Sequence, residues 1–144
     1  MYRNLAVVKG KTVIYSELSD GWEYLLLKDN YRYMTVSAET FNSLFERLTD
    51  TLAALREDCI EYVIYSPYTP LLAYPKWYID EHHDFGGSLY EHSFGTTYFY
   101  EESGEVLMSP GSVVLRNKLG DVRYMERETF FKYYEIPGGV EDHD

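Results

Sequence analysis

The sequence predicts an α+β fold built mainly from antiparallel β-sheet, and three observations carry this prediction. Short segments rich in β-branched and aromatic residues recur along the chain, bounded by Gly, Asp, Asn or Pro. Only one stretch sustains a long helical period of apolar residues. The length of 144 residues fits one domain. We therefore expect a single α+β domain over residues 1–136, followed by a flexible acidic tail over residues 137–144.

The N-terminal part of the chain predicts an antiparallel meander. Strand-like segments are separated by turn residues such as Gly10, Ser19-Asp20-Gly21 and Asp29-Asn30. These segments cover residues 5–8, 12–18, 22–28 and 31–36, and similar segments follow at 59–65, 96–102, 105–108, 112–118 and 122–125. Two meanders joined by one helix would account for this pattern.

One long amphipathic helix is expected between the meanders, packed on the sheet. Ser37 can act as its N-cap, and Glu39 lies in the first turn, where the helix dipole favours an acid. The stripe ends near Asp58 and consists of Phe41, Leu44, Phe45, Leu48, Leu52 and Leu55. A short C-terminal helix is expected over residues 128–134.

Two tripeptides occur twice in the same order. Arg-Tyr-Met stands at residues 32–34 and 123–125, and Glu-Thr-Phe stands at 39–41 and 128–130. We interpret the repeat as a strand-to-helix junction used twice, because Glu suits a helix N-terminus and Phe begins a buried stripe. After the Phe the copies are expected to differ, with a helix of about five turns in one and a short helix in the other.

Acidic residues concentrate in the second part of the chain. The net charge is −11 overall. Residues 58–144 hold six Lys/Arg against sixteen Asp/Glu, a net of −10, and no basic residue lies between Lys76 and Arg116. Such a field repels nucleic acid and acidic membranes and attracts basic protein surfaces. We therefore expect no direct binding to nucleic acid or membranes, and a protein partner with a basic surface.

Residues 66–95 form an irregular insert in which Tyr and Trp alternate with prolines and acids. Aromatic residues with a polar end are favoured at binding surfaces. They also pin long loops to a sheet as a small additional core, and both interpretations stand at this point. The candidate binding residues are Tyr68, Tyr74, Trp77, Tyr78, Asp80, Glu81, Asp84, Tyr90 and Glu91.

A metal-binding alternative rests on the densest polar cluster of the insert. Imidazoles and carboxylates are ligands for zinc, iron and manganese. The candidate ligands are His82, His83, Asp84 and His92. They lack the spacing of an established metal motif, so a solvated acidic loop is the competing explanation. No cofactor is predicted.

The cysteine content and the hydropathy indicate a soluble, intracellular protein. The single Cys59 cannot form an intramolecular disulfide, which suits a reducing compartment. No signal-type or membrane-spanning apolar run is present. Cys59 begins a strand-like segment, where a free cysteine is usually a small buried apolar residue.

Residues 103–135 resemble a small module of bacteriophage and prophage proteins. The shared features, in order, are Gly104-Glu105, Pro110-Gly111, Gly120-Asp121, Phe130 and Tyr134-Glu135. The resemblance implies a phage-type origin. It also implies an accessory protein that blocks a host enzyme or defence system by binding, or else a component of the virion.

The leading hypothesis is therefore a phage-type protein that acts by binding a protein partner through an acidic, Tyr-rich surface, in the host cytoplasm. A virion component and a metal-dependent hydrolase using His82, His83 and His92 are the alternatives. Enzymatic activity stays open, with non-enzymatic binding favoured, and assembly with a second copy of the chain is left open.

Overall fold

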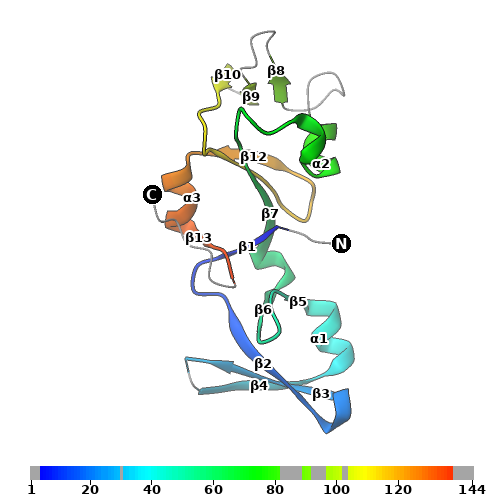
Figure 1. Cartoon of the computed structure of the whole chain (residues 1–144). Coiled ribbons are helices and arrows are strands. Elements are labelled where there is room, and N and C mark those ends of the chain that lie inside the picture. Colours follow the sequence, from blue (N-terminus) through cyan, green and yellow to red (C-terminus); the bar gives the residue numbers. More distant parts are fainter. Residues whose placement is uncertain (1–3, 30, 82–88, 92–96, 102–103, 138–144) are drawn as a thin grey trace. The chain divides into compact units, whose positions relative to one another are not determined.

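The computed structural model describes residues 4–29, 31–81, 89–91, 97–101 and 104–137 (Figure 1). The chain forms two compact units. Unit 1 comprises Met1–Glu61, Asn117–Leu119 and Phe131–Asp144, and unit 2 comprises Tyr62–Arg116 and Gly120–Phe130. Because the chain passes repeatedly from one unit to the other, this division does not cut the sequence into two segments. A single domain over residues 1–136 stays a prediction, and the tail beyond residue 137 lies outside the described residues.

Unit 1 contains an antiparallel five-stranded sheet with the strand order β4-β3-β2-β6-β5. The strands are β2 (Val13–Leu18), β3 (Glu23–Lys28), β4 (Tyr31–Ser37), β5 (Phe45–Arg47) and β6 (Leu52–Leu55). The predicted meander is confirmed for β2, β3 and β4, which follow one another along the chain (Figure 1). The helix α1 (Ala38–Leu44) packs on β3 and β4 and buries Phe41 among apolar residues of the sheet.

The prediction of one long helix is wrong, because α1 ends at Leu44 and the chain turns into the β5–β6 hairpin. Ser37 is the N-cap as expected, and its Oγ accepts a hydrogen bond from the Thr40 N–H at 3.1 Å. The spacing that suggests a helical stripe also lets Phe45 pair with Leu55 across a hairpin. Thr49 favours the hairpin over a continued helix, since its Oγ1 accepts hydrogen bonds from the backbone N–H groups of residues 51 and 52 and so closes a turn.

A second five-stranded sheet has the strand order β12-β11-β7-β1-β13. Its central strand, β7, belongs in part to each unit. In unit 1, β1 (Leu5–Val8) pairs with the first half of β7 (Cys59–Ile64) and with β13 (Tyr134–Glu135). In unit 2, β11 (Val113–Arg116) pairs with β12 (Val122–Met125). The predicted short C-terminal helix is present as α3 (Arg127–Tyr133).

The rest of unit 2 lies between β7 and β11 along the chain. It contains α2 (Lys76–Asp80) and a three-stranded antiparallel sheet in the order β10-β9-β8. Its strands are β8 (Leu89–Glu91), β9 (Thr97–Glu101) and β10 (Gly104–Leu107). Single 3-10 turns occur at Ser19–Gly21, Arg56–Asp58 and Leu71–Ala73. The mainly antiparallel α+β architecture is thus confirmed.

The two five-stranded orders repeat one arrangement. A first copy is built from β2, β3, β4, α1, β5 and β6, and a second copy from β7, β11, β12, α3, β13 and β1, in matching roles. The strand registers agree at three matching positions, although β3 and β4 shift register after Leu26 and β11 and β12 do not. The matching pairs are Val13↔Ala53 with Ile60↔Ala6, Glu46↔Ala54 with Glu135↔Val7, and Tyr24↔Val36 with Val113↔Met125. The last strand of the second copy is β1, which comes from the opposite end of the described chain.

The helices of the two copies match closely. Phe41 and Phe130 are each the fourth residue of a helix of 7 residues, and both are 0% exposed. The Phe41 ring lies 5.2 Å from that of Tyr15 with a 42° tilt, and the Phe130 ring lies 5.7 Å from that of Tyr62 with a 38° tilt. The Glu-Thr-Phe repeat therefore marks structurally equivalent residues. The expected difference after the Phe is wrong, since each helix is short and leads directly into a short strand.

The Arg-Tyr-Met repeat does not mark equivalent residues. Met34 pairs with Leu26 in the first copy, whereas Arg123 pairs with Leu115 in the second. Because Leu26 and Leu115 are counterparts, Met34 corresponds to Arg123 and the tripeptides are out of step by two residues. Both tripeptides nevertheless lie in equivalent strands, β4 and β12.

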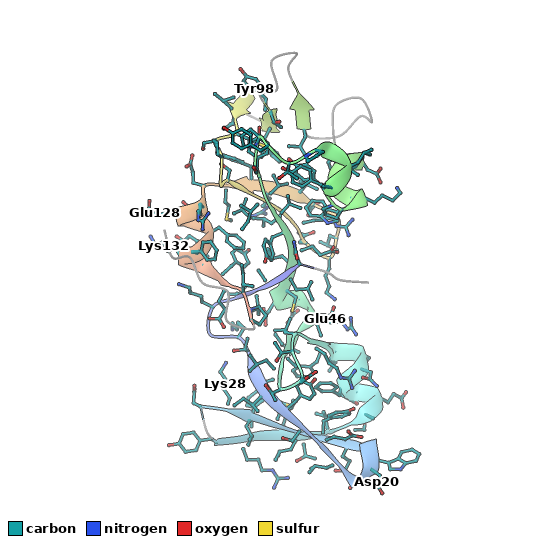
Figure 2. The ribbon with its side chains drawn as sticks, viewed as in Figure 1. Asp20, Lys28, Glu46, Tyr98, Glu128 and Lys132 are labelled. Carbon is teal, nitrogen blue, oxygen red and sulfur yellow. The ribbon has the colours of Figure 1, made fainter. Side chains whose placement is uncertain are left out.

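The copies differ most in the connection between their first two strands. In the first copy, β2 and β3 are joined by the short turn Ser19–Trp22, where Asp20 (Figure 2) has a left-handed backbone with φ of 56°. In the second copy, the equivalent connection runs through residues 66–111. Tyr65 at its start exchanges backbone hydrogen bonds of 2.8 Å with Gly111 and Ser112 at its end. The scaffold closes with a turn of four residues in one copy, so the long connection is an addition to it.

Among the residues that the structure describes, no helix is long and apolar enough to cross a membrane.

Candidate functional site

The predicted binding region falls within this added connection, which begins with the loop Ser66–Tyr74. The Tyr74 hydroxyl donates to the Ser66 carbonyl at 2.9 Å and accepts from the Ser66 N–H at 3.1 Å, so the two ends of the loop are held together. Within the loop, the Ser66 carbonyl also accepts from the Thr69 N–H at 3.2 Å, and the Pro70 carbonyl from the Ala73 N–H at 2.9 Å. The loop is ordered by its own hydrogen bonds.

Aromatic residues below the loop anchor it to the core of unit 2. Trp77 is 8% exposed and Tyr78 is 1% exposed, and both belong to the buried cluster that includes Val114. The Tyr78 ring lies 4.3 Å from the Tyr74 ring, and the Arg116 guanidinium lies 5.2 Å from the Trp77 ring centroid. The assignment of Trp77 and Tyr78 to a binding surface is therefore corrected. Their large apolar area is used to bury the base of the loop.

Two large apolar side chains, among those that the structure describes in the loop, face solvent. Tyr68 is 92% exposed and Leu72 is 86% exposed. Exposed large apolar residues on a loop that is already ordered are suited to binding, because less conformational entropy is lost when a partner docks. Tyr68 was predicted as a binding residue. Leu72 was missed, and its place between Pro70 and Pro75 is the sequence signal that could have found it.

The acidic candidate residues differ in their surroundings. Asp80 forms an ion pair with Lys76 one helical turn away, at 2.6 Å, and both side chains are well exposed. Such a pair is worth less than about 1 kcal/mol and neutralises part of the expected acidic field. Glu81 is half-buried at the end of α2. Asp84 lies outside the described residues, as do the side chains of Tyr90 and Glu91, whose backbone belongs to β8.

The residues of the metal-binding alternative, His82, His83, Asp84 and His92, also lie outside the described residues. Within the described ranges, no group of three or more His, Cys, Asp and Glu is placed to hold a metal ion. Cys59 is buried, and its thiol lies 3.4 Å from the Leu55 carbonyl, which agrees with the expected role as a small buried residue.

No family model, curated protein or solved structure matches the chain. The function proposed below therefore rests on the sequence and the geometry.

Proposed function

We propose that this protein acts without catalysis, by binding a protein partner with a basic surface through the Ser66–Tyr74 loop. The observation that carries the proposal is the exposure of Tyr68 and Leu72 on a loop closed by the Tyr74–Ser66 hydrogen bonds. Tyr is among the residues that contribute most to binding energy at protein interfaces.

The charge distribution supports a basic partner. The loop belongs to residues 58–144, which carry a net charge of −10, and the sequence from residue 77 to residue 115 contains no Lys or Arg. Such a field speeds the encounter with a positively charged surface and is weakened by salt. The apolar loop would then supply contact area, and the acidic surroundings would supply orientation and association rate.

The repeat in the fold supports the same location. One copy of the scaffold closes with Ser19–Trp22, so residues 66–111 are not needed to complete the other copy. A long connection that the scaffold does not require is a common place for function. If the chain is of phage origin, as its resemblance over residues 103–135 implies, the partner would be a host enzyme or defence factor.

The proposal predicts that Tyr68→Ala with Leu72→Ala weakens partner binding while leaving the fold intact. Removing an interface Tyr that contributes strongly costs about 2 kcal/mol, or roughly thirtyfold in Kd. Immobilised wild-type and double-variant protein would be compared for capture from bacterial lysate by quantitative mass spectrometry, at low and high salt. The captured partner would then be purified and its Kd measured by calorimetry.

Leu119→Ala is the matched control, because Leu119 is an equally exposed leucine (87%) outside the loop. It should leave capture unchanged. The proposal would be rejected if the double variant and the wild type capture the same proteins in the same amounts, or if capture is insensitive to salt.

A further inference from the structure

Arg47 in β5 lies on an aromatic platform formed by Tyr15, Tyr24 and Phe41. Its guanidinium carbon lies 5.9, 5.4 and 5.0 Å from the centroids of these three rings, respectively. The rings contact one another, with Tyr24 stacked on Phe41 at 4.3 Å. Interaction of a cation with several ring faces holds the planar group against the platform.

Two hydrogen bonds fix the orientation of the same guanidinium. One N–H donates to the Tyr24 hydroxyl at 2.8 Å and another to the Asn42 Oδ1 at 3.1 Å. Asn42 is itself held, because its backbone carbonyl accepts from Arg56 at 2.8 Å, and Arg56 pairs with Glu46 (Figure 2) at 3.4 Å. The position of Arg47 is thus determined by side chains and backbone around it.

The Arg47 guanidinium has further N–H donors besides those in the two hydrogen bonds described above. Arginine has five N–H groups, and the hydrogen bonds described above engage two of them. Arg47 is exposed, so the remaining donors can reach a ligand from solvent. An arginine with its ring contacts and orientation already set loses little entropy when it binds an anion.

The second copy of the scaffold has no cation at the register position that matches Arg47. By the strand registers, Arg47 corresponds to Ile136, and Tyr24 corresponds to Val113. The Tyr15–Phe41 contact is retained there as Tyr62–Phe130. Ile136 itself is half-buried and apolar. The repeated arrangement therefore has an uncharged residue at this register position in its second copy, and the charge of Arg47 calls for another explanation.

We propose that Arg47 on its platform of Tyr15, Tyr24 and Phe41 is a binding site for a carboxylate group. The planar, forked donors of arginine match the two oxygens of a carboxylate and make charge-assisted hydrogen bonds to it. Nucleic acid is disfavoured by the overall charge of −11, because its phosphates form a continuous line of negative charge, whereas a small carboxylate or a short acidic segment brings only a few charges. This site lies in the first copy of the scaffold and does not depend on the function proposed for the Ser66–Tyr74 loop.

The test uses NMR of the full-length, 15N-labelled protein, following the Arg47 Nε–H signal during titration at low salt. The probes are acetate, a tetraglutamate peptide and inorganic phosphate. We expect acetate and tetraglutamate to shift the signal in a saturable way. Tighter binding of tetraglutamate would identify an acidic protein segment as the natural source, and equal binding would identify a small carboxylate.

Arg47→Ile introduces the residue that the second copy uses, and the Arg47 signal itself disappears in this variant. Binding is therefore followed there through the backbone N–H of Asn42 and Tyr24, and we expect it to weaken at least about tenfold. Arg47→Lys keeps the charge but loses the fork, and should weaken binding severalfold. This variant also keeps the test valid if the isoleucine variant does not fold. Arg32→Ile removes another exposed arginine, which donates to the Thr35 hydroxyl at 2.7 Å, and should leave binding unchanged.

Three results would overturn the proposal. The first is the absence of a saturable shift with both acetate and tetraglutamate. The second is an equal loss of binding in Arg32→Ile and Arg47→Ile, which would indicate general charge attraction. The third is tighter binding of phosphate than of tetraglutamate, which would rule out a preference for carboxylates.

Discussion

The hydroxyl of Tyr74 determines the geometry of the Ser66–Tyr74 loop more directly than any other single group described above. It is donor and acceptor to the same residue, Ser66, eight positions away. The ring that carries it contacts the tilted ring of Tyr78 in the core of unit 2, with 4.3 Å between the ring centroids. One side chain therefore closes the loop and joins it to the core, while Tyr68, of the same residue type, remains in solvent.

Tyr74→Phe is expected to keep the ring contact and remove both hydrogen bonds to Ser66. The loss should lower the free energy of unfolding by about 1–3 kcal/mol, because the partly buried Ser66 N–H loses its partner and the Ser66 carbonyl keeps only the Thr69 N–H. Urea unfolding would measure the change, and limited proteolysis would show faster cleavage within residues 66–74. Tyr68→Phe is the control and should change neither, since Tyr68 is almost fully exposed. Equal protease resistance of Tyr74→Phe and the wild type would contradict this role.

At the scale of elements, the short helices α1 and α3 are the parts of the two copies that match best. Each begins after a strand, buries a Phe at its fourth position and leads into a short strand. Helices of two turns are not stable alone, so each depends on the burial of that Phe against the sheet. The ring contacts with Tyr15 and Tyr62 are the same contact made twice.

Phe41→Ala and Phe130→Ala are therefore expected to be similarly costly. Truncating a fully buried Phe typically costs about 3–5 kcal/mol. Chemical denaturation of both variants would test this expectation. Leu44→Ala lies in the same helix as Phe41 but at an exposed position, and should stay within about 0.5 kcal/mol of the wild type. A much smaller cost for one of the two Phe variants would argue against equivalent roles.

At the scale of the whole molecule, sequence patterns predict local structure well and long-range pairing poorly. The turns at Ser19–Gly21 and Asp29 and the Ser37 cap are determined by neighbouring residues, and they were predicted. The apolar spacing of residues 41–55 fits a helix and a hairpin equally. The pairing of Ala53 with Val13 and the Thr49 turn favour the hairpin, and neither is visible in the spacing.

The same limit applies to the candidate sites. Trp77 and Tyr68 have the same sequence signature, and only the packing of unit 2 shows that one is buried and the other exposed. Arg47 carries no signal in the sequence, because Tyr15, Tyr24 and Phe41 are brought to it from other elements. The repeat itself was visible in part, through Glu-Thr-Phe, but its register needed the strand pairing.

The repeat predicts that the chain tolerates a change of connectivity. In the first copy, β5 and β6 are joined by residues 48–51, and the equivalent strands β13 and β1 run antiparallel with Val7 opposite Glu135. Residue 136 should therefore be joinable to residue 5 by a linker of about four residues, with new ends opened between Lys11 and Thr12. This circular permutant should unfold cooperatively with the far-UV circular dichroism spectrum of the parent. A non-cooperative or unfolded permutant would contradict the assignment of β1 to the second copy.

The position of β1 also has a consequence for the order in which the protein can form during synthesis. The first copy is complete once residues 13–55 have left the ribosome, and its contacts are local in sequence. The second copy needs residues 134–135 before β1 has both of its neighbours. Contacts of such long sequence separation form slowly, since loop closure must precede them. Until then, β1 is a strand with an unoccupied edge on the nascent chain, open to pairing with the wrong strand.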